Sequence, residues 1–423
     1  MRLIELLAIP GAPLSTFVTE SWRAARGESA YPGVPPVEPA LRTVGEAVLD
    51  RSFSVAINLL VGMPRPEQVR RQRSELARAV EALGRRGYLA DPRRYHPAPE
   101  APRDWSLSAA HVRLGPGRTE YSDLRFASGF EPPEGIPGGD AWRAQESNRS
   151  AHAFVMEHPG APRPWLVCVH GFGMGTPSAN FTGFRARWLH EELGLNLIFP
   201  CLPLHGPRAG SRISGRELLR PEYTQLLHCF AQGVWDLRRT LGWLRERGAL
   251  AIGLHGISLG AYHSAIVAGL EQDLACVVAG IPAVDFPGVA RDNEPYLLRR
   301  FDPDTRIDWD AVRALTHVVS PLAFDPVLPR ERRYIYAGTA DRVARPDQAR
   351  ALWRHWEEPR IHWFASGHLA GLWKDSVWEF VRRSLRESEL IGSSRAAAQK
   401  RRPQRRAQRR PARAAAPRSR ARS

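Results

Sequence analysis

The stretch Gly256-Ile257-Ser258-Leu259-Gly260 decides the fold class, because it lies directly between a predicted strand, 251–255, and a predicted helix, 259–270. A G-x-S-x-G pattern in this context is typical of a sharp turn that exposes the serine hydroxyl above a sheet. Glycine is needed two residues before and two residues after the serine, because side chains there would collide in so tight a turn. Ser258 is therefore the candidate nucleophile. A chance match and a serine that caps the next helix are the alternatives.

Short apolar segments alternate with helical segments on both sides of this turn. The predicted strands are 165–170, 195–200, 251–255, 274–281, 333–337 and 360–364, and the predicted helices are 183–193, 225–247, 259–270, 346–356 and 371–385. Such an alternation indicates a mostly parallel sheet with helices on both faces, which is an α/β fold. Shorter strand candidates within 105–157 suit an antiparallel start to this sheet.

Two further residues complete a candidate acyl-transfer site. A serine hydroxyl is a weak nucleophile, so it needs a base within hydrogen-bond reach and an acid that orients the base. Asp341 follows the predicted strand 333–337, and His368 follows the predicted strand 360–364. Parallel sheets bind ligands at the carboxyl ends of their strands. We therefore expect Ser258, Asp341 and His368 to form a catalytic triad.

Other residues compete for the roles of acid and base. Asp285 follows the predicted strand 274–281 and is the main alternative acid, while an ordinary turn-forming role is the alternative for Asp341. Weaker candidates are Asp325 and Asp347 for the acid and His317, His355 and His362 for the base. These histidines lie within predicted elements, whereas a catalytic histidine is expected on a loop after a strand.

Acyl transfer also needs N–H donors aimed at the developing oxyanion, each worth about 3 kcal/mol. The loop His170-Gly171-Phe172-Gly173-Met174-Gly175 follows the first of the predicted parallel strands. We expect the backbone amides of Phe172 and Leu259 to be the two donors. A phosphate-binding dinucleotide loop is the alternative, but the spacing is not G-x-G-x-x-G and no ribose-binding acid is evident after the strand 195–200.

Residues from about 150 to 388 resemble the α/β-hydrolase superfamily, in which the triad follows the order Ser, Asp, His. The resemblance implies this fold, a serine nucleophile, and hydrolysis of an ester, with a thioester or an amide as other bonds. More narrowly, the stretches 254–260 and 366–371 (Leu-His-Gly-Ile-Ser-Leu-Gly and Ser-Gly-His-Leu-Ala-Gly) are similar to the branch numbered eighteen among animal abhydrolase-domain proteins. That branch is thought to act on lipid acyl esters. The implied substrate is an acyl ester or lipid, and this chemistry needs no metal or organic cofactor.

The amino-acid composition limits the classes of protein to which this chain can belong. Of 423 residues, 43% are hydrophobic and 25% are charged, which excludes disorder throughout. The longest apolar runs, near 54–63 and 274–284, are too short to span a membrane, and no secretory signal is evident at the start. The four cysteines lie far apart and form no metal-binding pattern, so we expect them to be reduced and buried. We expect a soluble, cytoplasmic protein.

Three regions are predicted along the chain. Residues 1–104 form a helical and loop extension without a chemical motif, and it includes an amphipathic helix at 67–83. Residues 105–390 form the hydrolase domain, with an inserted cap at about 282–329. Four aromatic residues of the cap are expected to line the acyl pocket or to pack within the cap: Phe286, Tyr296, Phe301 and Trp309.

The third region, 391–423, is expected to be a disordered Arg-rich tail. Residues 393–423 carry twelve Lys or Arg and no Asp or Glu, which is most of the net charge of +16. Such a tail neutralises phosphates and gives weak, salt-sensitive binding to nucleic acid or an anionic surface. The alternative function is therefore a hydrolase-fold protein with a non-catalytic binding role. A solubilising extension without a partner is the simpler interpretation of the tail.

Overall fold

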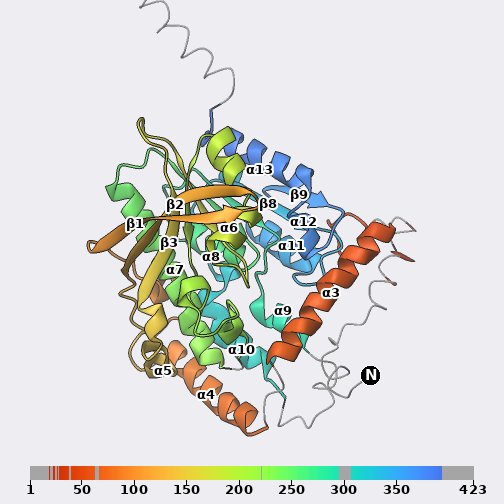
Figure 1. Ribbon diagram of the computed structural model, residues 1–423. Helices are drawn as coiled ribbons and strands as arrows, with labels where there is room; N and C mark the ends of the chain where they lie inside the picture. Colours follow the sequence, from red (N-terminus) through yellow and green to blue (C-terminus); the bar gives the residue numbers. More distant parts are fainter. Residues whose placement is uncertain are drawn as a thin grey trace, which may run out of the picture.

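The computed structural model describes residues 28–37, 40–61, 66–220, 222–294 and 306–392, together with four isolated positions before residue 28. A nine-stranded sheet runs through these residues, with helices on both sides of it (Figure 1). The predicted tail at 393–423 lies outside the described residues.

The sheet begins antiparallel and continues parallel, as expected. Its order is β1-β2-β3-β5-β4-β6-β7-β8-β9, in which β1, β2, β3 and β5 pair antiparallel and the remaining pairs are parallel. The strands are β1 (Trp105–Leu114), β2 (Gly117–Ala127), β3 (Ser150–Met156), β4 (Trp165–Val169), β5 (Asn196–Pro200), β6 (Ile252–Ile257), β7 (Cys276–Gly280), β8 (Arg333–Gly338) and β9 (Arg360–Phe364). All six predicted parallel strands are present.

The helices cover both faces of the sheet. They are α3 (Leu41–Val61), α4 (Pro66–Arg85), α5 (Gly139–Arg143), α6 (Pro177–Gly183), α7 (Tyr223–Glu246), α8 (Leu259–Ala268), α9 (Phe286–Asn293), α10 (Trp309–Thr316), α11 (Pro346–His355), α12 (His368–Gly371) and α13 (Asp375–Glu387). The structure differs at the predicted helix 183–193. There, Arg185 has a φ of 46° and only a short π-helical turn, Trp188–Glu192, follows α6.

Alternate residues of the central strands enter two separate cores, because successive side chains of a strand point to opposite faces. In β4, Val167 and Val169 pack with α7, α8 and α11, whereas Leu166 and Cys168 pack with α6 and α13. All four cysteines are free and buried, as expected. The mostly parallel sheet, covered on both faces, is the α/β-hydrolase fold predicted from the sequence.

Segments outside the sheet also pack on this core. The predicted amphipathic helix 67–83 is α4, which contacts α7 and α10. The predicted cap contributes α9 and α10, while the predicted cap residues Tyr296 and Phe301 lie outside the described residues. No helix in the described ranges is both long enough and apolar enough to cross a membrane.

Candidate active site

Ser258 lies on the turn between β6 and α8 and has a φ of 55°, a conformation that side chains rarely adopt. Contacts at the two predicted glycines explain why the turn can be so tight. A Cβ atom on Gly256 would lie 2.4 Å from the carbonyl oxygen of Gly260, and one on Gly260 would lie 1.9 Å from the carbonyl oxygen of Val169. Any residue with a side chain would force the backbone to move at either position. The tight turn at 256–260 is therefore the predicted strand-to-helix elbow.

The structure brings the three predicted triad residues into one hydrogen-bonded chain. The hydroxyl oxygen of Ser258 lies 3.0 Å from Nε2 of His368, and Nδ1 of His368 lies 2.6 Å from Oδ2 of Asp341. His368 and Asp341 are both buried. With the imidazole proton on Nδ1, the ring donates to Asp341 and leaves Nε2 free to accept the serine proton.

The other carboxylate oxygen of Asp341 fixes the loop that carries it. Oδ1 accepts hydrogen bonds from the amides of Val343 and Ala344, both at 2.9 Å. The carboxylate is therefore held by its own loop on one side and faces His368 on the other. This arrangement orients the imidazole as a triad acid must.

Asp285, the main alternative acid, has other partners. Its side chain accepts a hydrogen bond from the amide of Gly288 and caps the start of α9. It also pairs with Arg313 at 2.7 Å. Asp285 is thus a helix cap and an ion-pair partner, and the chain of hydrogen bonds from Ser258 ends at Asp341.

The electrostatic surroundings of His368 favour its charged form. Burial is the largest single effect and disfavours the imidazolium, but the carboxylates of Asp341 and Asp50 together outweigh it, so the pKa of His368 is raised above its ordinary value. A base with a raised pKa accepts a proton more readily. The site can therefore take the proton of the Ser258 hydroxyl and stabilise the imidazolium that results.

The loop with the predicted oxyanion donors passes directly beside the nucleophile. A Cβ atom on Gly171 would lie 3.5 Å from the Cβ atom of Ser258. The amide of Phe172 donates no hydrogen bond to any other described residue. The amide of Leu259 opens α8, where first-turn amides have no acceptor within the helix. One predicted donor thus follows Gly171, which lies beside Ser258, and the other directly follows Ser258 in the chain.

His170 ties this loop to the loop after β5. Its Nε2 accepts a hydrogen bond from the amide of Leu202 at 3.0 Å. Burial lowers the pKa of His170 to about 3, so the ring stays neutral and can act as an acceptor. His170 is therefore a structural residue, which fixes the position of the neighbouring Gly171–Gly175 loop.

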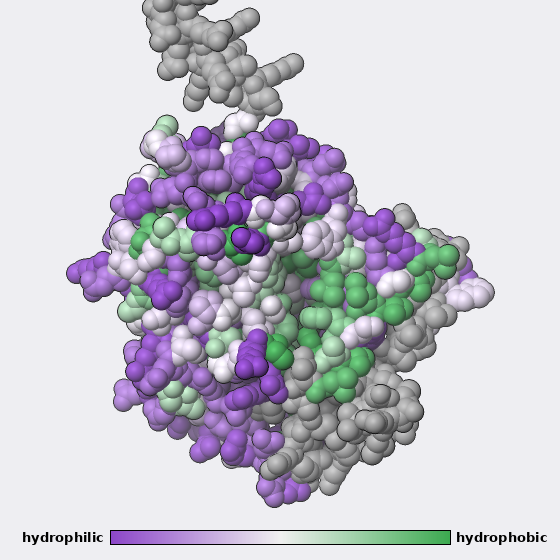
Figure 2. Space-filling model, viewed as in Figure 1, coloured by the Kyte–Doolittle hydropathy of each residue, from purple (hydrophilic) through white to green (hydrophobic). Residues whose placement is uncertain are grey.

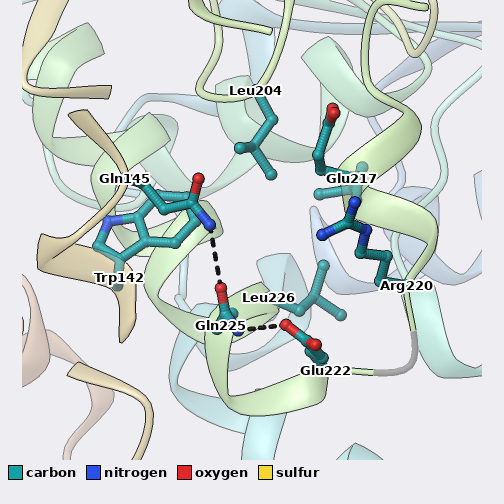
Figure 3. A pocket seen from close by; sticks show the side chains of 9 residues that line it. Trp142, Gln145, Leu204, Glu217, Arg220, Glu222, Gln225 and Leu226 are labelled. Atoms are coloured by element: carbon teal, nitrogen blue, oxygen red, sulfur yellow. Dashed lines mark hydrogen bonds between the residues drawn. The ribbon is translucent and has the colours of Figure 1, made fainter. Parts of the chain in front are cut away.

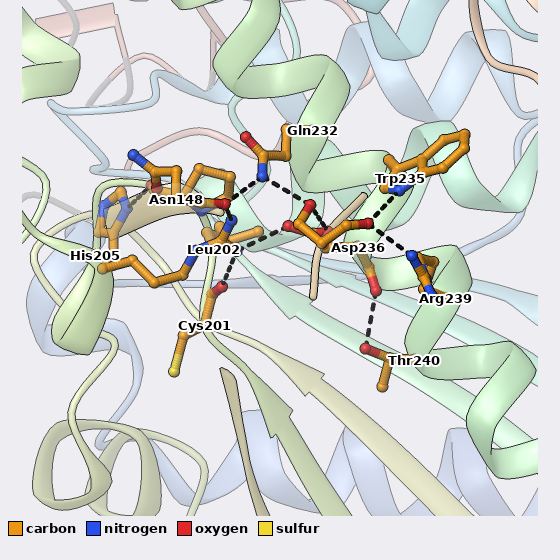
Figure 4. A network of polar contacts seen from close by, with 12 residues as sticks. Asn148, Cys201, Leu202, His205, Gln232, Trp235, Asp236, Arg239 and Thr240 are labelled. Carbon is orange, nitrogen blue, oxygen red and sulfur yellow. Dashed lines mark hydrogen bonds and ion pairs between the residues drawn. The ribbon is translucent and has the colours of Figure 1, made fainter. Parts of the chain in front are cut away.

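A buried ion pair holds the loop after β5 from the other side, within a polar network whose members Asp236, Cys201 and Asn148 are labelled in Figure 4. The guanidinium of Arg208 lies 2.8 Å from the carboxylate of Asp236, and Arg208 is fully buried. Arg208 also donates to the carbonyl oxygens of Cys201 and Asn148, both at 3.0 Å. Charges buried in this way must stay paired and hydrogen-bonded. The network thus fixes a loop that supports the candidate oxyanion site.

Two hollows in the described part of the chain are not lined by the three triad residues. Figure 3 shows the smaller one, where Trp142, Gln145 and Glu217 surround about 20 Å³, room for about one water molecule. The larger, about 310 Å³, is lined by residues that include Tyr262 and Phe286. Neither volume is assigned to a substrate.

The predicted cap aromatics in the described residues pack against helix α7. The ring centroids of Phe286 and Phe230 are 5.2 Å apart, and those of Trp309 and Tyr223 are 6.0 Å apart. These contacts fit the alternative in which the aromatic residues pack the cap onto the core.

Sequence reasoning missed two acids on α3. This helix exposes apolar side chains on its outer face (Figure 2), which include Leu41, Val44, Val48, Leu49 and Leu59. Glu46 and Asp50 instead point inward, toward the loop that carries His368. The usual amphipathic pattern is therefore reversed. Two acids one turn apart, in a helix rich in apolar residues, were the signal available in the sequence.

The elbow and the strand order are those of the α/β-hydrolase fold, and a hydrogen-bonded chain of Ser258, His368 and Asp341 lies at the elbow. No model of a known protein family matches the sequence. Uncharacterized protein Rv2627c of Mycobacterium tuberculosis strain H37Rv is 34% identical over 381 residues, which cover 90% of each chain. Uncharacterized protein MT2702 of strain CDC 1551 matches with the same identity and coverage. The chain belongs to the family of these mycobacterial proteins.

Solved structures with a similar fold include two esterases. Acetyl Xylan Esterase 1 from Thermoanaerobacterium is 16% identical with a TM-score of 0.49, and the match covers 73% of this chain and 93% of the esterase chain. Est1E from Butyrivibrio proteoclasticus, solved with ferulic acid bound, is 15% identical with a TM-score of 0.41, and the match covers 56% of this chain and 96% of the Est1E chain. At these identities the likeness concerns the fold.

Proposed function

We propose that the protein is a serine hydrolase that cleaves carboxylic esters through an acyl-enzyme. The observation that carries the proposal is the buried hydrogen-bonded chain from Ser258 through His368 to Asp341 at the elbow. Structural serines rarely combine a positive φ, a histidine nitrogen at 3.0 Å and an acid behind that histidine.

In the first half of the reaction, the hydroxyl oxygen of Ser258 attacks the ester carbonyl carbon while Nε2 of His368 takes the hydroxyl proton. The carbonyl oxygen becomes an oxyanion, which the amides of Phe172 and Leu259 stabilise. The C–O bond to the alcohol then breaks, and His368 gives the proton to the leaving alcohol. Asp341 keeps the imidazole in the required tautomer throughout.

In the second half, water attacks the acyl group on Ser258. His368 takes a proton from the water, and returns it to the serine oxygen as the carboxylic acid leaves. The protein's own side chains and amides supply every proton transfer and charge contact in these steps. No metal or organic cofactor enters this mechanism.

The substrate in this proposal is an acyl ester, with a thioester or an amide as other bonds that the same groups attack. The similarity of 254–260 and 366–371 to the abhydrolase branch numbered eighteen supports lipid acyl esters as one class to test.

The direct experiment is a screen of the purified full-length protein against p-nitrophenyl esters of increasing acyl length, acyl thioesters and peptides, beside Ser258→Ala. We expect ester hydrolysis by the wild type, and loss of nearly all of it in Ser258→Ala. A folded wild type that cleaves none of these, or a Ser258→Ala variant with wild-type rates, would contradict the proposal.

A further inference from the structure

We propose that Asp50 is a positioning residue of this site, which holds the loop of His368 and the loop of Asp341 together from helix α3. The inference rests on the proposed function and extends it, because it brings a helix of the N-terminal region into the catalytic apparatus.

The carboxylate of Asp50 binds three backbone amides on two loops. Oδ2 accepts from the amide of His368 at 2.6 Å and from the amide of Arg342 at 3.1 Å. Oδ1 accepts from the amide of Leu369 at 3.2 Å. Arg342 directly follows the triad acid, Asp341. One buried carboxylate therefore links the backbone on which the base stands to the backbone that adjoins the acid.

Gly367 shows how closely Asp50 approaches the histidine loop. A Cβ atom on Gly367 would lie 2.7 Å from Oδ2 of Asp50, although the backbone of Gly367 is extended and suits any residue. The close approach of the carboxylate, rather than the φ angle, therefore accounts for glycine immediately before the catalytic histidine.

Glu46, one turn earlier on α3, makes a second attachment to the same loop. It accepts a hydrogen bond from the hydroxyl of Ser366 at 2.6 Å and pairs with Lys374 at 3.1 Å. The loop from 366 to 374 is thus attached to α3 at both ends, with the base between the two attachments. Hydrogen bonds to ionised carboxylates are roughly twice as strong as neutral ones, so α3 restrains this loop firmly.

The charge of Asp50 has its own effect on His368. The charged or titratable groups that face His368 are Asp341 and Asp50, and both raise its pKa. Asp50 in turn faces Asp341 and His368 on the two loops and Arg51 on its own helix. Burial, followed by the nearby Asp341, raises the pKa of Asp50 to about 6. Above this value Asp50 is ionised and favours the imidazolium.

The test compares kcat, KM and the pH profile of ester hydrolysis in the wild type, Asp50→Asn and Ser54→Ala. Asparagine has the size of aspartate but keeps only one acceptor oxygen, so at least one amide loses its partner. Ser54 is the control, because it is buried on the same helix one turn further on. Its hydroxyl bonds to Asn293 at 2.7 Å and to the carbonyl oxygen of Asp50 at 3.2 Å, and to no amide of the two triad loops.

We expect Asp50→Asn to lower kcat by roughly 10- to 100-fold, the cost of a displacement of about 1 Å at a catalytic group. KM should change little. The acidic limb of kcat/KM should move down by up to about one pH unit, because a negative charge near the imidazole is lost. Ser54→Ala should keep the wild-type kcat and pH profile.

A folded Asp50→Asn with wild-type kcat, or with a lower kcat and an unmoved acidic limb, would overturn the proposal. If Asp50→Asn does not fold, Gly367→Ala replaces it, since its Cβ pushes the carboxylate away from the loop and removes no polar group. It should lower kcat by roughly tenfold, and a wild-type kcat in this variant would overturn the proposal. An inactive wild type would instead count against the proposed function itself.

Discussion

The hydroxyl oxygen of Ser258 lies 3.0 Å from Nε2 of His368, although 110 residues separate the two in sequence. Ser258 follows β6 and His368 follows β9, and the strands β7 and β8 lie between these two in the sheet. The histidine loop must therefore reach across two strands to meet the serine. The sheet alone does not fix the distance between them. The contacts that Asp341 and α3 make with the histidine loop also hold it in place.

Replacing the acid should separate the two candidates that the sequence left open. Asp341→Asn keeps an acceptor for the amides of Val343 and Ala344, but it presents N–H to His368, so the imidazole proton moves to Nε2. We expect kcat to fall by up to roughly 10⁴-fold with the fold intact. Asp285→Asn is the control and should keep most of the activity. A crippled Asp285→Asn beside a nearly normal Asp341→Asn would reverse the assignment.

The pH dependence of kcat/KM should report His368 in the free enzyme. Only the neutral imidazole accepts the serine proton, so activity is lost as the pH falls through its pKa. Because that pKa is raised above the ordinary value of 6.5, we expect the midpoint of the acidic limb above pH 6.5. A pH titration of initial rates measures it. A midpoint well below 6.5 would show that Asp341 does not stabilise the imidazolium.

The elbow should tolerate no side chain at Gly260. Gly260→Ala would place a Cβ atom 1.9 Å from the carbonyl oxygen of Val169, so the backbone must move or the protein must unfold. We expect a large loss of thermal stability and no hydrolysis. Gly45→Ala is the control, since nothing lies within 4 Å of its Cβ position on α3, and helix propensity should stabilise it by up to about 1 kcal/mol. Equal melting temperatures for the two variants would contradict the elbow geometry.

The ion pair of Arg208 and Asp236 should matter for stability. Arg208→Met leaves the carboxylate of Asp236 buried without its partner, which typically costs about 3 to 5 kcal/mol. The matched control is Arg187→Met, because Arg187 pairs with Glu191 on the surface, where water and salt screen the pair and its loss has little effect on stability. Urea unfolding of both variants measures the difference. A small loss in Arg208→Met would mean that the loop after β5 has another support.

The fold was predictable because each parallel strand is a short apolar run of its own. The glycines at 256 and 260 indicated where the elbow lies. The alternation of strands and helices indicated the fold class, which the structure confirms. Arg185 shows where the pattern failed: the apolar spacing continued through 183–193, but a positive φ at this residue interrupts the helix. Tertiary packing determines such a break, and periodicity does not record it.

The triad residues meet as their positions after strands predicted, and their catalytic roles stay predictions. Asp50 could not be found in the same way. It acts on backbone amides, which every residue except proline carries, so no partner side chain marks the contact in the sequence. Its traces in the sequence are Gly367 and the two acids one turn apart on α3, and neither of them identifies a backbone amide more than 290 residues away as the partner. Contacts between a side chain and a distant backbone therefore need the structure.

The measurement that tests the account most directly is labelling of the native protein with a fluorophosphonate probe, followed by mass spectrometry of its peptides. An activated serine beside a base reacts with such a probe, whereas ordinary serines do not. We predict a single adduct, on Ser258, that is absent from Ser258→Ala and strongly slowed in Asp341→Asn. Labelling that persists in Ser258→Ala, or an adduct on another serine, would contradict the central claim.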